Sequence, residues 1–125
     1  MTDVITTYDT LLADYLAFWN EADPQARATV AERTFTADVH YVDPQASVSG
    51  RDALTEHVGA VHAALPGMTF SIGDLVDGHH DVVRFRWFLG PAADPRLIEG
   101  FDVATLSEEG RITSVIGFLD KVPQG

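Results

Sequence analysis

Residues 97–122, LIEGFDVATLSEEGRITSVIGFLDKV, contain two strongly apolar segments separated by the turn Glu108-Glu109-Gly110. Two such segments joined by a short glycine-containing turn predict an antiparallel hairpin, with strands at Leu97–Ser107 and Arg111–Val122. Successive side chains of a strand point to opposite faces of the sheet, and both faces of these two strands are apolar. One face carries Phe101, Val103, Ile116 and Phe118, and the other carries Ile98, Ala104, Leu106, Val115 and Leu119. A sheet with one face in water alternates cleanly, so two apolar faces indicate that something covers the second face. A second copy of this short chain is the economical candidate, and we predict a homodimer packed through the outer face of the sheet.

Two more strands are expected upstream of this hairpin, at Met68–Val76 and Val82–Leu89. The connections at residues 77–80 and 90–95 contain glycine or proline, which is typical of turns between antiparallel strands. The second half of the chain therefore predicts a four-stranded antiparallel meander.

The first 65 residues have helical periodicity instead. Apolar side chains recur at three- and four-residue steps over Val4–Asn20, where Asp3 is a candidate cap. Asp23-Pro24 has the pattern of an N-cap followed by the first helical position, which predicts a second helix to about Phe35. A third helix is expected at Arg51–Leu65, after a short strand at Val39–Asp43 and a loop at 45–50. The order α-α-β-α-β-β-β-β predicts an α+β domain, with three helices packed on a strongly curved, mostly antiparallel sheet.

Composition limits the classes of function. The chain has 125 residues, no cysteine and a formal net charge of −11, so we expect one domain spanning residues 1–125, without disulfides or thiol chemistry. Binding to nucleic acid or to an anionic membrane surface would require a cluster of cationic side chains. The 8 lysine and arginine residues of this chain are scattered along the sequence and form no such cluster. No signal peptide or membrane-spanning run is evident, and we expect a cytoplasmic protein.

Two local motifs resemble those of the nuclear transport factor 2-like or SnoaL-like superfamily. The first is Tyr41-Val42-Asp43-Pro44 followed by Gly50-Arg51-Asp52-Ala53-Leu54, and the second is Gly100-Phe101-Asp102-Val103 followed by Glu109-Gly110-Arg111-Ile112. The order of the expected elements is also that of this superfamily. The resemblance implies a cone-shaped fold around one small-molecule pocket, but it does not specify an activity, because the superfamily includes isomerases, cyclases, dehydratases, epoxide hydrolases and binding domains.

Three residues match the pattern of the ketosteroid isomerases within this superfamily: Tyr15, Asp43 and Asp102. The resemblance implies that ionised Asp43 takes a proton from the carbon next to a carbonyl, while Tyr15 and protonated Asp102 stabilise the oxyanion. In those isomerases, an apolar site keeps the second carboxylic acid neutral so that it can donate a hydrogen bond. In SnoaL-like polyketide cyclases, the position of Asp102 carries an acid/base aspartate. Tyr15 and Asp43 are a few residues further apart here than in the isomerases.

The wall of the pocket is expected to come from aromatic and aliphatic side chains on the same elements. The candidates for substrate contact are Trp19, Tyr41, Phe85, Trp87, Val115 and Leu119. The ligand is expected to be a small apolar carbonyl compound, and we expect no cofactor and no metal ion, because no phosphate loop, dinucleotide fingerprint or metal-ligand spacing is present.

Each site residue also has a purely structural explanation. Asp43 could serve only the turn at Pro44, Tyr15 could be a core tyrosine, and Asp102 could pair with Arg84 or Arg86. We expect these arginines to face away, because they alternate with Phe85 and Trp87.

The histidines give no metal pattern. His79 and His80 lie in an expected turn, and His57 and His62 do not share a helix face. One of His57 and His62 could reach the cavity as a second acid or base, although a surface position is favoured.

Three functions therefore stay open. An isomerase or cyclase is favoured over a non-catalytic binding or dimerisation module. That module would fill the pocket with side chains or tie up its carboxylate in a salt bridge. An epoxide hydrolase of this fold would need an inward arginine, and a dehydratase would need a pocket histidine.

Overall fold

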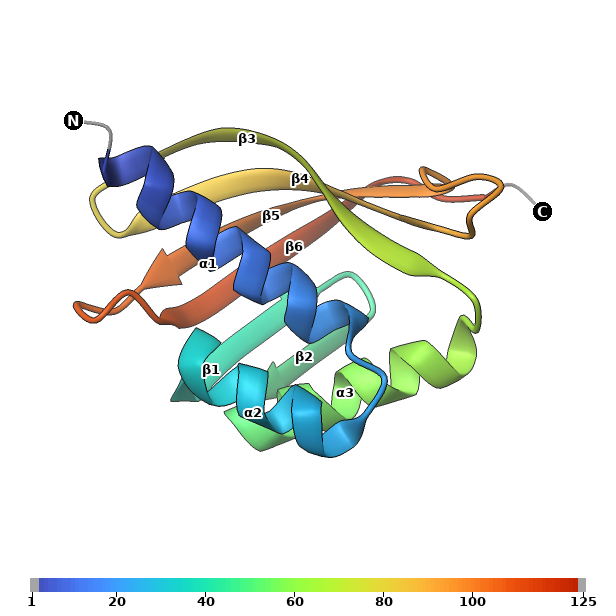
Figure 1. Ribbon diagram of the computed structural model, residues 1–125, viewed down its shortest axis with the longest axis horizontal. Helices are drawn as coiled ribbons and strands as arrows, with labels where there is room; N and C mark the ends of the chain where they lie inside the picture. Colours follow the sequence, from blue (N-terminus) through green and yellow to red (C-terminus); the bar gives the residue numbers. More distant parts are fainter. Residues whose placement is uncertain (1–2, 124–125) are drawn as a thin grey trace.

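The structure is a computed structural model that describes residues 3–123, apart from the side chains of residues 3–7 and 74–76. Three helices, α1 (Asp3–Asn20), α2 (Pro24–Thr34) and α3 (Arg51–Ala64), pack on one curved sheet. The strands are β1 (Phe35–Asp43), β2 (Ala46–Ser49), β3 (Thr69–His79), β4 (Val82–Gly90), β5 (Ile98–Leu106) and β6 (Ile112–Lys121). In Figure 1, α1 runs diagonally across the sheet, and α2 and α3 lie beside β1 and β2. The predicted α+β class with three helices on a curved, mostly antiparallel sheet is confirmed.

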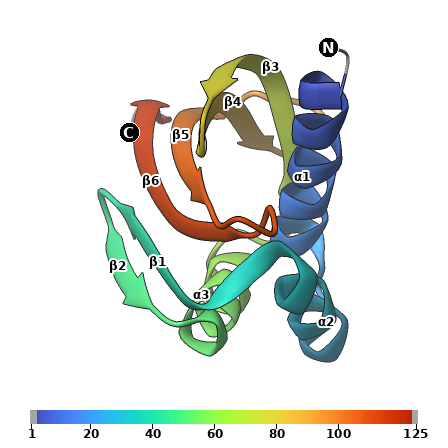
Figure 2. The same ribbon diagram turned by 90° about the vertical axis from the view of Figure 1, so that its left-hand side faces the viewer.

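The strand order is β2-β1-β6-β5-β4-β3, and every neighbouring pair is antiparallel except β1 with β6. Figure 2 shows how β3 to β6 curl around, while α1 closes the open side of the curve. This curvature wraps the inner face of the sheet around α1. The core on this face contains Phe18, Phe35, Val39, Leu54, Val58, Val83, Phe85, Ile112 and Val115, all at most 1% exposed.

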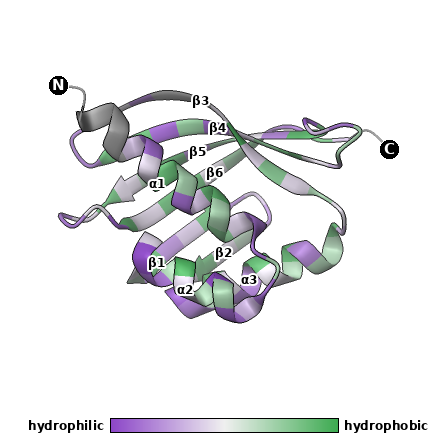
Figure 3. Cartoon of the chain, viewed as in Figure 1, coloured by the Kyte–Doolittle hydropathy of each residue, from purple (hydrophilic) through white to green (hydrophobic). Residues whose placement is uncertain are grey.

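The start of α2 and the buried face of α3 follow from their own residues. The side chain of Asp23 accepts a hydrogen bond from the backbone N–H of Ala26 at 2.8 Å, and Pro24 is the first residue of α2, as predicted. Along α3, Leu54 and Val58 are buried, and the C-terminal half of this helix is coloured mainly hydrophobic in Figure 3. The expectation that Asp3 caps α1 lies outside the described side chains.

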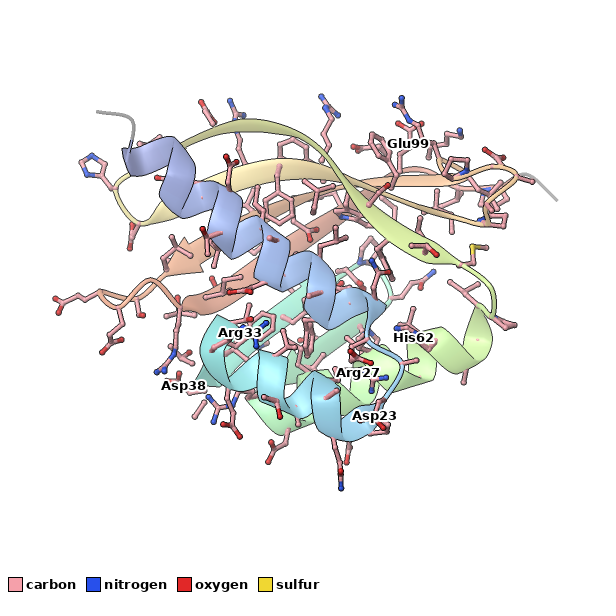
Figure 4. The ribbon with its side chains drawn as sticks, viewed as in Figure 1. Asp23, Arg27, Arg33, Asp38, His62 and Glu99 are labelled. Carbon is pink, nitrogen blue, oxygen red and sulfur yellow. The ribbon has the colours of Figure 1, made fainter. Side chains whose placement is uncertain are left out.

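A buried arginine, which the sequence patterns did not single out, ties the helices together. Arg27 is 3% exposed and donates hydrogen bonds to the backbone carbonyls of Glu21 and Ala22 before α2 and of Thr55 on α3. Figure 4 labels it at the junction of these helices. Gly59 makes room for it, since a Cβ there would lie 3.0 Å from a guanidinium nitrogen of Arg27.

The structure corrects three boundaries. The expected loop at 45–50 contains β2, which pairs with β1 through a turn held by the Asp43 side chain. Strand β1 begins at Phe35 rather than Val39. The sequence pattern missed these first residues, because an irregularity between Phe35 and His40 disturbs the period-two alternation that marks a strand. Residues 77–79, expected in a turn, extend β3, and the chain reverses at His80 and Asp81 instead, where His80 has a φ of 51°.

Both sheet faces carry apolar residues, as the sequence predicts. On the outer face, Phe101 pairs with Phe118 and Val103 pairs with Ile116 across β5 and β6. Ile116 is 46% exposed and Phe118 is 51% exposed. These four residues form one contiguous group, called here the outer apolar patch.

Candidate functional site

A cavity of about 430 Å³ lies between the inner face of the sheet and the helices α1 and α3. Its wall is mainly aromatic and aliphatic, and the side chains that matter for its chemistry are Tyr15, Trp19, Tyr41, Asp43, His57, Trp87 and Asp102. The volume lies in the lower part of the range of small-molecule sites, roughly 300–1,000 Å³. The cavity therefore has room for one small ligand.

Asp102 is the buried acid of this cavity. It is 3% exposed, and both of its carboxyl oxygens accept hydrogen bonds from neutral donors. The Tyr15 hydroxyl donates to Oδ2 at 2.7 Å, and Trp87 Nε1–H donates to Oδ1 at 2.9 Å. Burial raises the pKa of Asp102 to about 6, although the two hydrogen bonds lower it and the nearby Asp43 raises it. A carboxyl group with this pKa exchanges its proton near neutral pH.

Two glycines make this arrangement possible. A Cβ on Gly100 would overlap Cζ2 of Trp87, so only glycine lets the indole lie against β5. A Cβ on Gly117 would lie 2.8 Å from Oδ1 of Asp102 and 3.4 Å from Cβ of Asp43. The sheet register explains the second case, since Gly117 pairs with Asp102 and follows the β6 residue that pairs with Val42. Gly117 therefore brings the two aspartates close together on the inner face.

Asp43 is held by three donors at the end of β1. Its Oδ1 accepts hydrogen bonds from the backbone N–H groups of Gln45 at 2.8 Å and Ala46 at 2.9 Å, and its Oδ2 accepts one from the Tyr41 hydroxyl at 2.6 Å. The carboxylate thus fixes the Asp-Pro turn, and it also lines the cavity. The position of Asp43 therefore fits both expectations from the sequence, a residue of the Asp-Pro turn and a residue of the cavity wall.

The two tyrosines keep their protons. Burial, together with the nearby Asp102, raises the pKa of Tyr15 far above its ordinary value. Burial and the hydrogen bond to Asp43 do the same to the pKa of Tyr41. Both hydroxyls therefore act as hydrogen-bond donors to carboxylates at physiological pH.

Four of the six residues expected in the cavity wall line the cavity, and the other two do not. Trp19, Tyr41, Trp87 and Leu119 line the cavity. Phe85 and Val115 are fully buried in the core and do not line it, because they lie at the packed end of the inner face, where the Phe85 ring is 5.4 Å from that of Tyr15.

The charged residues beside the pocket strands face outward. Arg84 pairs with Asp77 at 2.6 Å, and Arg86 lies 3.9 Å from Asp120; both arginine side chains are about half exposed. As expected, neither reaches Asp102. Figure 4 labels Glu99 on the same outer side of the sheet, away from the helices.

His57 lines the cavity. The sequence favours a surface position but leaves open that one of His57 and His62 reaches the cavity, and His57 is that residue. Its ring centroid is 5.8 Å from that of Tyr41 and 6.4 Å from that of Trp19. His62 points toward the end of α1, where Nε2 lies 2.7 Å from the backbone oxygen of Trp19. Helical spacing alone could not place His57, because the width of the buried face of α3 depends on the sheet opposite it. Among the side chains that the structure describes, at residues 8–73 and 77–123, no three histidine or acidic groups are placed to hold a metal ion together.

Comparisons with known proteins agree with this fold. The profile of the SnoaL-like domain family matches residues 12–115, so the chain belongs to the SnoaL-like domain family. A crystal structure of a proposed isomerase of the SnoaL-like family from Agrobacterium tumefaciens is 34% identical, covers 92% of this chain and 98% of its own, and superposes with a TM-score of 0.86. A search of curated proteins finds no match.

More distant structures share the fold alone. A proposed SnoaL-like polyketide cyclase from Jannaschia is 14% identical, covers 88% of this chain and 85% of its own, and has a TM-score of 0.66. TsrD from Streptomyces laurentii is 15% identical, covers 92% of this chain and 89% of its own, and has a TM-score of 0.71. None of the helices described within residues 3–123 has the length and apolar character needed to cross a bilayer.

Proposed function

We propose that this protein is a cofactor-independent enzyme that moves a proton on the carbon next to the carbonyl group of a neutral, apolar ring compound. Asp102 is the acid/base group in this proposal. The observation that carries it is a buried carboxyl group in the wall of an apolar cavity, held by Tyr15 and Trp87 and free of any cationic partner among residues 8–73 and 77–123.

The pKa of Asp102 suits this role. A general base works best when its pKa lies close to the working pH, because it must both accept the proton and return it. Ionised Asp102 takes the proton, and its carboxylic acid form, which the buried site favours, gives the proton back at another carbon. Tyr15 and Trp87 position the carboxyl group, since each holds one of its oxygens.

These contacts support a different division of roles from the one that the ketosteroid isomerase pattern implies. That pattern makes Asp43 the base and leaves the Tyr15 hydroxyl free for the oxyanion. Here the Tyr15 proton is directed at Asp102, and the Asp43 oxygens are engaged by three donors. We therefore assign proton transfer to Asp102, positioning of its carboxyl group to Tyr15, and the shape of the cavity wall at the end of β1 to Asp43 with its turn.

The alternatives have weaker support. A non-catalytic module was expected to have a filled pocket or a salt-bridged carboxylate, whereas the cavity is hollow and the partners of Asp102 are neutral. An epoxide hydrolase was expected to need an inward arginine, and Arg84 and Arg86 face outward. A dehydratase remains the second candidate, because it would use a pocket histidine and His57 lines the cavity.

The charge of the wall selects the ligand. Its described lining contains the acids Asp43 and Asp102 and includes no lysine or arginine. A carboxylate or phosphate on the ligand would lose its hydration without gaining a cation, so anionic compounds are disfavoured. The aromatic rings of Trp19, Phe70 and Trp87 favour a flat or ring-shaped apolar compound.

Deuterium exchange tests the proposal without knowledge of the natural substrate. The protein is incubated in D₂O with β-tetralone and other neutral ring ketones, and deuterium entering the carbon next to the carbonyl is followed by NMR. Wild type is expected to accelerate exchange, and Asp102→Asn is expected to lose at least about 100-fold of that acceleration. The matched control is Asp120→Asn, an exposed residue on β6. Equal rates for wild type and Asp102→Asn, or no acceleration with any ketone, would overturn the proposal.

We also propose a homodimer through the outer apolar patch. Its four side chains, Phe101, Val103, Ile116 and Phe118, are adjacent across two strands, and the guanidinium group of Arg86 lies 5.5 Å above the Phe101 ring. Sedimentation is expected to show a dimer for wild type and a monomer for Phe118→Lys, with the cavity unaffected. A monomeric wild-type protein would rule out the dimer.

A further inference from the structure

Nearly every strong hydrogen-bond donor around the cavity is already committed to a protein acceptor. The Tyr15 hydroxyl and the Trp87 N–H are directed at Asp102, and the Tyr41 hydroxyl is directed at Asp43. When a proton leaves the carbon next to a carbonyl, negative charge develops on the carbonyl oxygen, and a donor must face that oxygen. The donors that hold the two aspartates cannot serve it without giving up those contacts.

His57 is different. Its imidazole lines the cavity and is held by its ring faces and edges, with Tyr41 at 5.8 Å and Trp19 at 6.4 Å between ring centroids. Within the part of the chain that the structure describes, it makes no hydrogen bond and no ion pair. Every fully buried side-chain nitrogen or oxygen in that part of the chain has a hydrogen-bond partner. Since the ring nitrogens of His57 have none, they are not fully buried and can be reached by a ligand. An imidazole has at least one N–H in both of its charge states.

Two other polar side chains near the cavity are less suited to donate a hydrogen bond to the carbonyl oxygen of a ligand. His62 lies five residues further along α3, and its Nε2 already contacts the backbone oxygen of Trp19 at 2.7 Å. Gln45 lines the cavity from the turn after Asp43, but its side chain is exposed to solvent. His57 is half-buried, and a donor that is less exposed to water stabilises a developing charge more strongly.

We propose that His57 donates a hydrogen bond to the carbonyl oxygen of the substrate and stabilises it as it becomes an enolate oxygen. This inference rests on the proposed function. In the step, the carbon–hydrogen bond breaks and its proton forms a bond with a carboxylate oxygen of Asp102. The electron pair becomes the new carbon–carbon double bond, and the carbonyl electrons move to the oxygen that faces His57. Return of the proton from Asp102 to carbon reverses or completes the reaction, so no further reactant is needed.

Binding of an enol analogue tests this role separately from catalysis. β-Naphthol is the flat aromatic counterpart of the enol of β-tetralone, and naphthalene has the same rings without the oxygen. Dissociation constants for both are measured by NMR titration of the labelled full-length chain. Wild type is expected to prefer β-naphthol, and His57→Phe, which keeps an aromatic ring between Tyr41 and Trp19, is expected to lose about tenfold of affinity for β-naphthol alone.

Matched variants locate the donor. Gln45→Leu and His40→Phe, the latter an exposed residue on β1, are expected to keep the preference for β-naphthol. His57→Gln, which retains a donor, is expected to recover part of the loss. In unmutated protein, the ring ¹⁵N signals of one of the five histidines are expected to shift on adding β-naphthol and not on adding naphthalene, which covers the case in which His57→Phe does not fold.

The inference is overturned if β-naphthol does not bind, if His57→Phe weakens both ligands equally, or if Gln45→Leu removes the preference. The exchange reaction separates this failure from that of the proposed function. If His57→Phe loses the preference while wild type fails to exchange β-tetralone, His57 recognises the oxygen but the proposed proton transfer is wrong. If exchange depends on Asp102 while His57→Phe is fully active, the proton transfer stands and the role of His57 is wrong.

Discussion

Replacing Asp102 with asparagine is expected to change the pH dependence of stability in a way that follows from the burial of its carboxyl group. Burial raises the pKa from 3.8 to about 6, so between these values the folded protein binds more protons than the unfolded chain. Stability is therefore highest below the unfolded pKa and falls as the pH rises toward the folded pKa. The ionised form costs the folded state about 3 kcal/mol above pH 6, because one pKa unit corresponds to about 1.4 kcal/mol.

Asparagine cannot ionise, so this cost disappears. Its amide offers one acceptor oxygen in place of two, which costs about 1 kcal/mol through the weakened contact with Tyr15 or Trp87 at every pH. Relative to wild type, Asp102→Asn is therefore expected to be about 1 kcal/mol less stable at pH 3 and about 2 kcal/mol more stable at pH 7. Urea unfolding of both proteins across this range measures the difference, with Asp120→Asn as the exposed control. A difference that stays constant with pH would refute the claim that folding shifts this carboxyl group.

Three other substitutions test the contacts of the site and the helices. Tyr15→Phe removes a hydrogen bond that lowers the pKa of Asp102, so the midpoint of its titration, read by carboxyl ¹³C NMR, is expected to move to higher pH; an unchanged midpoint would show that the hydroxyl does not hold the carboxylate. Gly100→Ala places a methyl group where it overlaps Cζ2 of Trp87, so it is expected to shift the tryptophan fluorescence and cost about 2 kcal/mol of stability, and a wild-type spectrum would contradict the packing described. Arg27→Met leaves three backbone carbonyls without their donor and is expected to cost about 3 kcal/mol in urea unfolding, whereas a loss below about 0.5 kcal/mol would match a surface residue.

Much of the fold can be predicted because its signals are local. The period of α1, the Asp23-Pro24 start of α2 and the apolar runs of β4 to β6 each depend on nearby residues. The parts that the sequence patterns missed depend on tertiary pairing. Strand β2 has only four residues, and it forms a strand by pairing with β1. The first half of β1 does not show the alternation of a strand, because its register is irregular after Phe35.

The candidate site shows the same division. Alternation along β5 placed Asp102 on the inner face, and alternation along β4 placed its two arginines on the outer face. It could not show that Tyr15 donates to Asp102, since these residues are 87 positions apart. Nor could it show that Phe85 and Val115 lie at the packed end of the same face that carries Trp87 and the cavity.

The two glycines left a signal that was available in the sequence. Gly100 and Gly117 each lie inside a predicted strand, where a glycine often marks a close approach by another group. What approaches them, the indole of Trp87 and the carboxyl group of Asp102, became evident only from the strand register.

The pH profile of deuterium exchange into β-tetralone tests the role of Asp102 most directly. With Asp102 as the base, the catalysed rate is expected to rise about tenfold per pH unit below its pKa and to level off above about pH 6. The residual rate of Asp102→Asn is expected to show no such inflection. An inflection near pH 6 that persists in Asp102→Asn would assign the proton transfer to another group and contradict this account.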